Sequence, residues 1–210
     1  MSYFFKRKNL AILILAAGRS KRMGENNKIL LKLKTSFMIN IIIEKFMKLG
    51  FKKIYVVLGH QSTKIKRYLK KKKVIIVKNK SYNLGQSSSI RVGISAIEKT
   101  SDNILIALGD MPFISLKLID NLSKKHLREK NHLDKITLPK HNKIYRNPVI
   151  WGKNFYPKLK NLNNDQGAKF LLKDNCKSIN EVNWKEEGEF FDIDTRKDFH
   201  FIHNYRGKYL

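Results

Sequence analysis

A short apolar run over residues 10–15 leads into a loop of small residues and cations. Ala16, Ala17 and Gly18 are small enough to let a phosphate chain approach the backbone N–H groups, which can form an anion-binding nest. The cations that would surround this anion are Arg19, Lys21, Arg22 and Lys28. The loop matches neither a Walker A loop nor a G-x-G-x-x-G dinucleotide loop. Two interpretations therefore stay open, a phosphate-binding loop and a tight turn with solvated cations.

A carboxylate follows a second apolar run. Asp110 lies two residues after the run over 104–108, where Gly109 gives the backbone room and Pro112 makes the turn rigid. An Asp in this position often caps the next helix, but Ser115 suits that cap and leaves Asp110 for another task. A carboxylate that faces a phosphate loop suits Mg²⁺, which takes one or two carboxylates together with phosphate oxygens.

Two more carboxylates lie near the end of the chain. Asp192 and Asp194 alternate along an extended stretch, so they share one side, and either could supply a second metal ligand. Asp194 could instead cap the final helix, with Asp198 in its first turn. The residues favour the cap for Asp194 and the metal for Asp192, and both alternatives stay open.

The elements that must position these residues alternate between strand and helix. Strands are expected over residues 11–15, 53–58, 74–77 and 104–108, and helices over 38–49, 63–71, 87–97 and 115–128. Ser87 or Ser88 would cap the third helix. After residue 133 the pattern loosens to strands at 136–138, 148–151 and 190–192 and helices at 166–172 and 195–205.

This alternation predicts a mostly parallel sheet with helices on both faces. Open α/β sheets bind ligands beyond the carboxyl ends of their strands. We therefore expect the cationic loop after the first strand and the acidic loop after the fourth strand to lie side by side, so that both contact one ligand.

The composition limits the class of protein. The chain has 210 residues, of which 42% are hydrophobic, and shows no linker or repeat, so one domain over 1–210 is expected. No apolar run approaches the ~18 residues that span a bilayer. A secretory signal over 10–17 is disfavoured, because its cleavage would delete the first strand. The single Cys176 fits a reducing compartment, and we expect a cytoplasmic protein without a membrane partner.

The net charge of +27 permits a nucleic-acid binder. However, no nucleic-acid-binding motif is visible, and the chain is rich in Lys, Asn and Ile, which favours cations spread over solvated faces. Nucleic acid is therefore a disfavoured partner. The same positive field would attract a small polyanionic substrate.

Several separated motifs resemble, in order, those of the MobA-like nucleotidyltransferases; they are LAAGRSKRMGENNKILL, GQSSSIRVGI, LGDMP, RNPVIW, DQGAKFLL and DIDTRKDF. The resemblance runs from about residue 10 to residue 199. It implies the family's fold, a Rossmann-like (GT-A-like) α/β three-layer sandwich with a mostly parallel sheet. It also implies transfer of a nucleotidyl group from a nucleoside triphosphate (NTP) to a phosphate, with release of pyrophosphate.

The motifs are most similar to the branch of molybdenum cofactor cytidylyltransferases, which implies CTP as the donor and molybdopterin as the acceptor. The Ala-Ala-Gly sequence at 16–18 is the feature that resembles the cytidylyl branch and so indicates cytosine as the base. Many members of this branch have Gly-His-Pro at 146–148 and Gly-Asp-x-Gly-Ala-Arg at 164–169, where this chain reads Arg-Asn-Pro and Asn-Asp-Gln-Gly-Ala-Lys. A sugar or polyol phosphate therefore stays open as the acceptor, and so does a cofactor-binding chaperone for a molybdenum-dependent oxidoreductase.

Matching positions carry the family's functional residues over to this chain. The resemblance implies that Arg22 and Lys28 stabilise charge on the phosphates in the transition state. It implies that Asp110 binds Mg²⁺, with Asp192 or Asp194 as the second ligand. The acceptor-binding residues would be Arg146, Asn147 and Pro148. The peripheral cations would be Arg19 and Lys21. The nucleotide-binding residues would be Leu15, Ala16, Ala17, Gly18, Ser20, Arg22, Met23, Gly24, Lys28, Gly85, Gln86, Ser87 and Gly109.

Overall fold

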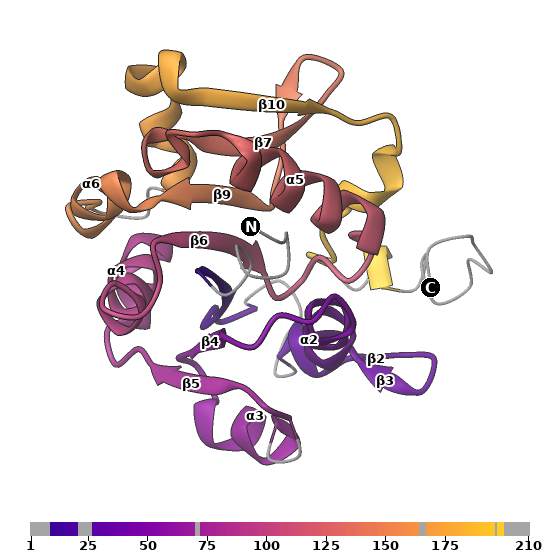
Figure 1. The fold of residues 1–210 in the computed structure, drawn as a ribbon. Coiled ribbons are helices and arrows are strands. Elements are labelled where there is room, and N and C mark those ends of the chain that lie inside the picture. The colour runs from indigo at the N-terminus through magenta and orange to yellow at the C-terminus, as the bar shows by residue number, and fades with distance from the viewer. Residues whose placement is uncertain (1–8, 21–26, 70–71, 164–166, 196, 200–210) are drawn as a thin grey trace.

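The computed structural model describes residues 9–20, 27–69, 72–163, 167–195 and 197–199. Within these residues an eight-stranded sheet runs in the order β10-β7-β9-β6-β1-β4-β5, with β8 paired to β7 (Figure 1). The strands are β1 (Leu10–Ala16), β4 (Ile54–Leu58), β5 (Ile75–Lys78), β6 (Asn103–Leu108), β7 (Ile136–His141), β8 (Ile144–Tyr145), β9 (Val149–Gly152) and β10 (Ile179–Asn183). Only β8 and β9 run antiparallel to their neighbours in this described sheet, so the predicted mostly parallel sheet is confirmed.

Helices cover both faces of the sheet. They are α2 (Met38–Lys48), α3 (Ser62–Leu69), α4 (Gln86–Ile97), α5 (Leu116–Arg128) and α6 (Tyr156–Lys160). Alternate residues of β1 point to opposite faces. Ile12 and Ile14 share a buried apolar cluster with α2, α3 and α5, whereas Leu13 and Leu15 share one with α4 and α6. Figure 1 shows α4 and α6 on one side of the sheet and α2 and α5 on the other, which gives the predicted three-layer sandwich.

Short elements connect these layers. A small hairpin pairs β2 (Lys32–Leu33) with β3 (Ser36–Phe37). Turns of 3₁₀ helix are η2 (Lys28–Leu30), η3 (Tyr82–Leu84), η4 (His132–Asp134), η5 (Lys153–Phe155), η6 (Ala168–Ser178) and η7 (Glu187–Phe190). Ser115 caps α5 as predicted, since its Oγ accepts a hydrogen bond from the Leu118 N–H at 3.0 Å.

The expected cap of α4 is wrong. The N-cap is Gly85, whose φ of +83° lies in the region that favours glycine, and no side chain caps the helix there. Ser87 and Ser88 are instead buried inside the first turn. The Ser88 hydroxyl donates to the Gly85 carbonyl at 2.8 Å and contacts the Asn79 amide at 2.9 Å. The serines therefore hold the preceding loop onto the helix.

Two expectations beyond residue 133 are also wrong. The helix expected over 166–172 is, in its described part, a run of 3₁₀ turns that begins at Ala168. The strand expected over 190–192 pairs with no described strand, and β10 holds that edge of the sheet instead. Of the final helix expected over 195–205, residues 197–199 are helical, and 196 and 200–205 lie outside the described residues.

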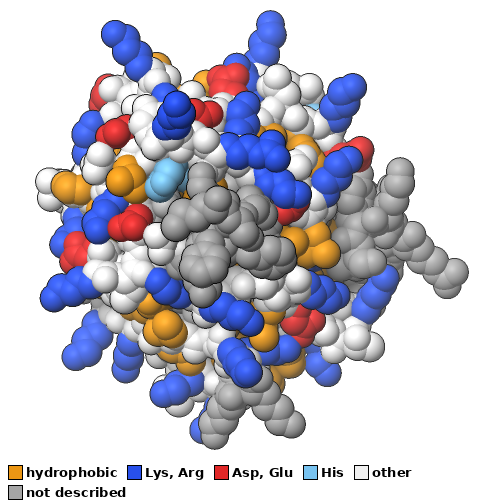
Figure 2. Space-filling model, in the orientation of Figure 1, with side chains coloured by type: hydrophobic (Ala, Val, Ile, Leu, Met, Phe, Trp, Pro, Cys, Tyr) orange, Lys and Arg blue, Asp and Glu red, His pale blue; other side chains and the backbone are white. Residues whose placement is uncertain are grey.

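On the face of the molecule displayed in Figure 2, the positive charge is not concentrated in one patch. Figure 2 shows Lys and Arg side chains scattered over the displayed face, with acidic and apolar side chains between them. This pattern fits solvated cations better than a basic stripe for nucleic acid. Among the described helices, none has both the length and the apolar character needed to cross a bilayer.

A buried polar network lies at the opposite end of the sheet from the predicted site. His126 of α5 contacts Thr137 Oγ1 through Nδ1 and Asn103 Oδ1 through Nε2, both at 2.9 Å, and His132 also contacts Asn103 Oδ1. Because an amide oxygen only accepts, Nε2 of His126 carries the proton and Nδ1 accepts from the threonine hydroxyl. Burial, followed by the neighbouring His132, lowers the pKa of His126 to about 3.

This neutral histidine predicts a loss of stability in mild acid. His126 takes up a proton near pH 6.5 in the unfolded chain but only near 3 in the folded chain, so its contribution is complete above pH 6.5 and is lost as the pH falls. From pH 7 to pH 5 the free energy of unfolding should fall by about 2 kcal/mol through this residue. Urea titrations of the wild-type chain and of His126→Gln should show a smaller pH dependence for the variant. Equal dependence would contradict the assignment.

Candidate active site

The ends of β1 and β6 lie side by side at one edge of the sheet. The two strands are parallel neighbours, with Leu15 opposite Leu108, and the Gly109 N–H donates to the Leu15 carbonyl at 2.9 Å. A Cβ added at Gly109 would lie 3.2 Å from both Ala16 Cβ and Leu15 O. The glycine therefore lets the two turns approach closely, and the loop at Gly18 and the carboxylate of Asp110 line the same cavity.

This cavity has a volume of about 520 Å³. Of the residues predicted for the site, it brings together Leu15, Ala16, Ala17, Gly18, Ser20, Lys28, Gly85, Gln86, Asp110 and Asp194. Ser87, Gly109 and Asp192 are not among the residues that line it. The predicted residues Arg22, Met23 and Gly24 lie outside the described residues. Residues that the prediction missed are Asn27, Ile29, Tyr82, Asn83, Ser89 and Leu108.

Arg19 is a correction to the sequence analysis. It was expected at the periphery, but it lines the cavity, and its guanidinium carbon lies 5.8 Å from the centre of the Tyr82 ring. Such a cation–π contact fixes the direction of a long side chain. Because Tyr82 lies in η3, more than sixty residues away in the chain, no local pattern could identify this contact.

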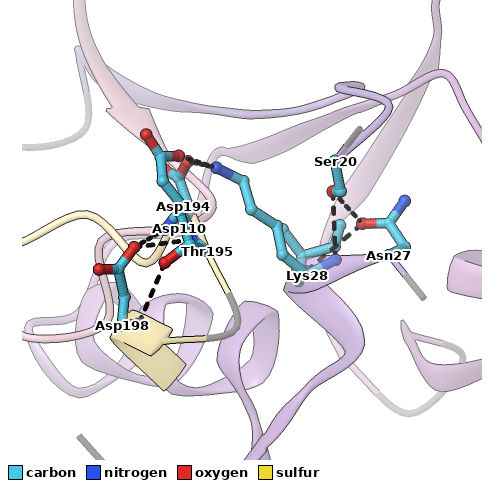
Figure 3. A network of polar contacts seen from close by, with 8 residues as sticks. Ser20, Asn27, Lys28, Asp110, Asp194, Thr195 and Asp198 are labelled. Atoms are coloured by element: carbon cyan, nitrogen blue, oxygen red, sulfur yellow. Dashed lines mark hydrogen bonds and ion pairs between the residues drawn. The ribbon is translucent and has the colours of Figure 1, made fainter. Parts of the chain in front are cut away.

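The loop after β1 closes through side-chain hydrogen bonds. Ser20 has a φ of +53°, and its Oγ accepts from the Lys28 N–H at 3.1 Å. The Asn27 Oδ1 accepts from the Ile29 N–H and so caps η2. Figure 3 shows how Ser20 and Asn27 lie against the backbone of Lys28, whose side chain extends away from them toward the carboxylates.

Lys28 connects two carboxylates that are far apart in the chain. Its Nζ forms ion pairs with Asp110 Oδ2 and, at 2.7 Å, with Asp194 Oδ1 (Figure 3). Burial alone would lower the pKa of Lys28, but the two carboxylates together raise it above its ordinary value. The lysine is therefore charged at neutral pH and holds the β6 loop and the C-terminal segment together.

The structure also separates the roles of the last carboxylates. Thr195, not Asp194, forms the helix cap, because its Oγ1 accepts from the Asp198 N–H at 3.1 Å while Asp198 accepts from the Thr195 N–H at 2.7 Å. Asp194 lines the cavity and pairs with Lys28, so among the described contacts Thr195 serves the cap and Asp194 serves the site. Asp192 is an exposed residue, yet burial by the protein around its carboxylate and then the charges of Asp110 and Asp194 raise its pKa to about 6.

The carboxylates fit a divalent cation that also binds phosphate. Asp110 Oδ1 is buried and has no hydrogen-bond partner among the described residues. Burial and then the negative charges of Asp110 and Asp194 raise the pKa of Asp192, and a nearby cation would oppose that shift. In the described part of the chain, no three acidic, histidine or cysteine side chains converge as a complete metal cage. That arrangement suits Mg²⁺, which takes one or two carboxylates and completes its shell with phosphate and water.

A smaller cavity of about 80 Å³ adjoins the first and shares Gln86 and Leu108 with it. Of the three residues predicted to bind the acceptor, Asn147 lines it, but Arg146 and Pro148 do not. Lys169, which was not predicted for the site, lies in its wall. Burial and then the positive charge of Arg146 lower the pKa of Lys169, so two cations lie near this cavity.

Comparison with known proteins supports one family. The family model described as MobA-like NTP transferase domain matches residues 12–181. The bifunctional protein GlmU of Thermosipho melanesiensis is 35% identical over 144 residues, which are 67% of this chain and 29% of that protein. GlmU of Thermosipho africanus is 30% identical over 186 residues, which are 88% of this chain and 39% of that protein. The chain thus spans about a third of the length of the curated relatives it matches.

Solved structures share the fold. Rv0371c of Mycobacterium tuberculosis H37Rv superimposes with a TM-score of 0.80 at 18% identity, over 94% of this chain and 98% of that one. A complex of Rv0371c with manganese has a TM-score of 0.72 at 18% identity, over 94% and 99% of the two chains. The 4-diphosphocytidyl-2C-methyl-D-erythritol synthase of Anaerococcus prevotii has a TM-score of 0.75 at 16% identity, over 98% and 99%. The chain belongs to the MobA-like NTP transferase domain family and has the fold of a nucleotidyltransferase.

Proposed function

We propose that the chain transfers CMP from CTP to the terminal phosphate of molybdopterin, with Mg²⁺ as the cofactor and pyrophosphate as the second product. One observation is the main support for nucleotidyl transfer. The small-residue turn after β1, the ammonium of Lys28 and the carboxylate of Asp110 line one cavity of about 520 Å³. That combination supplies backbone donors and a cation for a triphosphate, and an anionic ligand for a metal.

The reaction requires two anions to meet. An acceptor phosphate oxygen attacks the α-phosphorus of CTP in line, a new P–O bond forms, and the bond to the β-phosphate breaks so that pyrophosphate leaves with the electron pair. Backbone N–H groups at 16–18 would bind the phosphates, and Lys28 would turn from the carboxylates to neutralise the growing charge. Mg²⁺ held by Asp110 and by Asp194 or Asp192 would supply further electrostatic stabilisation. Arg22 keeps its predicted role in the same clamp.

Two features support cytidine as the base. The Ala-Ala-Gly turn at 16–18 resembles the cytidylyl branch. The fold is also shared with a synthase whose product name contains a diphosphocytidyl group. Gly85, Gln86 and Ser89 at the start of α4 form the far wall of the cavity, where the base or the ribose would lie.

The acceptor would enter through the adjoining cavity. Asn147 and Lys169 line it, and Arg146 adds a second positive charge nearby, so a phosphate group suits it. A polyol or sugar phosphate is the second candidate, because the described walls enclose only about 80 Å³, which favours a compact acceptor. A molybdenum-dependent oxidoreductase would be a partner only if molybdopterin is the acceptor.

A substrate matrix tests this proposal. CTP, GTP, ATP and UTP are each combined with molybdenum cofactor, a sugar 1-phosphate and a polyol phosphate, and pyrophosphate release is measured with Mg²⁺ present. We expect the highest kcat/KM for CTP with molybdenum cofactor. Release with another acceptor would replace molybdopterin by that acceptor, and no release with any pair would contradict nucleotidyl transfer.

Substitution of Asp110 tests the metal role. Asp110→Asn removes the negative charge of a cavity carboxylate and should lower turnover about 10³-fold, since metal stabilisation of the transition state is worth several kcal/mol. Asp102→Asn is the matched control, because Asp102 precedes the other end of β6 and pairs with Lys153 at the surface. Steady-state rates for both variants, with circular dichroism to confirm folding, give the answer. Equal activity of the two variants would remove Asp110 from the site.

Substitution of Lys28 tests the phosphate clamp. Lys28→Met should lower kcat about 10²–10³-fold, as loss of a preorganised transition-state donor does. Lys32→Met is the control, because Lys32 is an exposed lysine four residues further along the chain. Stopped-time assays at saturating CTP measure the effect. A normal kcat for Lys28→Met would show that the lysine only joins the two carboxylates.

A further inference from the structure

Glu189 is a buried carboxylate outside the two cavities. Its side chain is 4% exposed, and Oε2 accepts a hydrogen bond from the Ser115 N–H at 2.8 Å across 74 residues of sequence. Ser115 is the N-cap of α5. Burial of a carboxylate costs free energy unless the group is hydrogen-bonded or paired with a cation. The hydrogen bond to Ser115 therefore helps to explain why Glu189 can be buried.

The contact completes a helix cap from a distant part of the chain. In a capping box, the N-cap hydroxyl binds the N–H three residues on, and an acidic side chain at that third position binds the N-cap N–H. Here Ser115 makes the first contact, but the third position is Leu118, which has no acceptor in its side chain. Glu189 supplies the missing acceptor and thereby docks its own segment on the start of α5.

A third element stabilises the docked carboxylate. Lys45 of α2 donates to the Pro112 carbonyl at 2.5 Å, within the loop that joins Asp110 to α5. Burial lowers the pKa of Lys45 to about 8, and the negative charge of Glu189 opposes that shift. The Asp110 loop, α2 and the segment around Glu189 therefore share one electrostatic contact.

The segment that follows Glu189 carries the candidate metal ligands. The Ile193 N–H donates to the Asp110 carbonyl, and the Ile193 side chain is buried with Leu33, Met38 and Phe113. Asp192 and Asp194 flank Ile193 in the sequence, and Asp194 reaches Lys28. This run has no strand partner in the described sheet. Side-chain contacts therefore add to this one backbone hydrogen bond in holding the run beside the Asp110 loop.

We propose that Glu189 is a positioning residue that docks the segment carrying Asp192 and Asp194 against the Asp110 loop, so that carboxylates from both parts of the chain reach one divalent cation. The inference rests on the proposed function, because it assigns the cation to that site. Glu189 itself does not contact the substrates. Its loss would displace the ligand-bearing segment without removing any ligand.

The test compares Glu189→Ala with three matched variants. Glu189→Gln keeps an acceptor for the Ser115 N–H. Ser115→Ala weakens the cap of α5 but leaves its backbone N–H for Glu189. Glu187→Ala removes an exposed glutamate of the same turn. Hydrogen exchange of peptides covering 187–195 reports docking, and electron paramagnetic resonance titration with Mn²⁺ alone reports the metal site.

In Glu189→Ala we expect faster exchange over 187–195 and about 10-fold weaker Mn²⁺ binding. A 10-fold loss of metal affinity is at the low end of what removal of an outer-shell partner causes. Glu189→Gln should recover most of the affinity, and Ser115→Ala and Glu187→Ala should bind Mn²⁺ like the wild-type chain. Unchanged exchange and affinity in Glu189→Ala, or an equal loss in Ser115→Ala, would overturn the proposal. If the wild-type chain binds no Mn²⁺, the metal site itself fails, and exchange still shows separately whether Glu189 docks the segment.

Discussion

The parallel pairing of β1 with β6 is the constraint on which the candidate site depends. In-register parallel strands end at the same edge, so the turn after Ala16 and the turn after Leu108 must lie together. Gly109 makes that approach close, because any larger side chain would meet Ala16 and the Leu15 carbonyl. The apolar clusters on both faces hold the two strands in place. The positions of the strand ends then determine where the two loops lie. Burial of apolar side chains thus sets the distance between a cationic loop and a carboxylate.

Charge balance then organises the loops themselves. Asp110 and Asp194 both pair with Lys28 at this edge, and their charges also act on Asp192 nearby. Asp110 Oδ1 is buried and has no hydrogen-bond partner among the described residues, and burial followed by the charges of Asp110 and Asp194 raises the pKa of Asp192, so the lysine leaves negative charge uncompensated. A triphosphate with a divalent cation would balance these charges. The carboxylates would bind the cation, and Lys28 would pair with the phosphates. The cavity therefore suits a polyanion that binds together with a divalent cation, whereas on the face displayed in Figure 2 the Lys and Arg side chains are scattered.

Local patterns were sufficient to predict most of the fold. The apolar runs that became β1, β4 and β6, and the Ser115 cap, depend on neighbours within a few residues. The apolar run around 190–192 predicted a strand, but Phe190 and Ile193 are buried in apolar clusters and their segment pairs with no described strand. The serines at the start of α4 were misread because buried contacts with Asn79 and Gly85 engage Ser88. The interactions of Arg19 with Tyr82, of Lys169 with Arg146 and of Glu189 with Ser115 could not be predicted, since each partner lies far along the chain.

The central claim is that one triphosphate binds the β1 turn and, through a divalent cation, Asp110. Crystals of the chain grown with CTP and Mn²⁺ in place of Mg²⁺ would test it directly, because manganese gives an anomalous scattering peak that locates the cation. The account predicts that peak in coordination distance of the Asp110 carboxylate and of a phosphate oxygen, with the triphosphate against the backbone of 16–18. A nucleotide bound outside the cavity, or a manganese peak remote from Asp110, would contradict it.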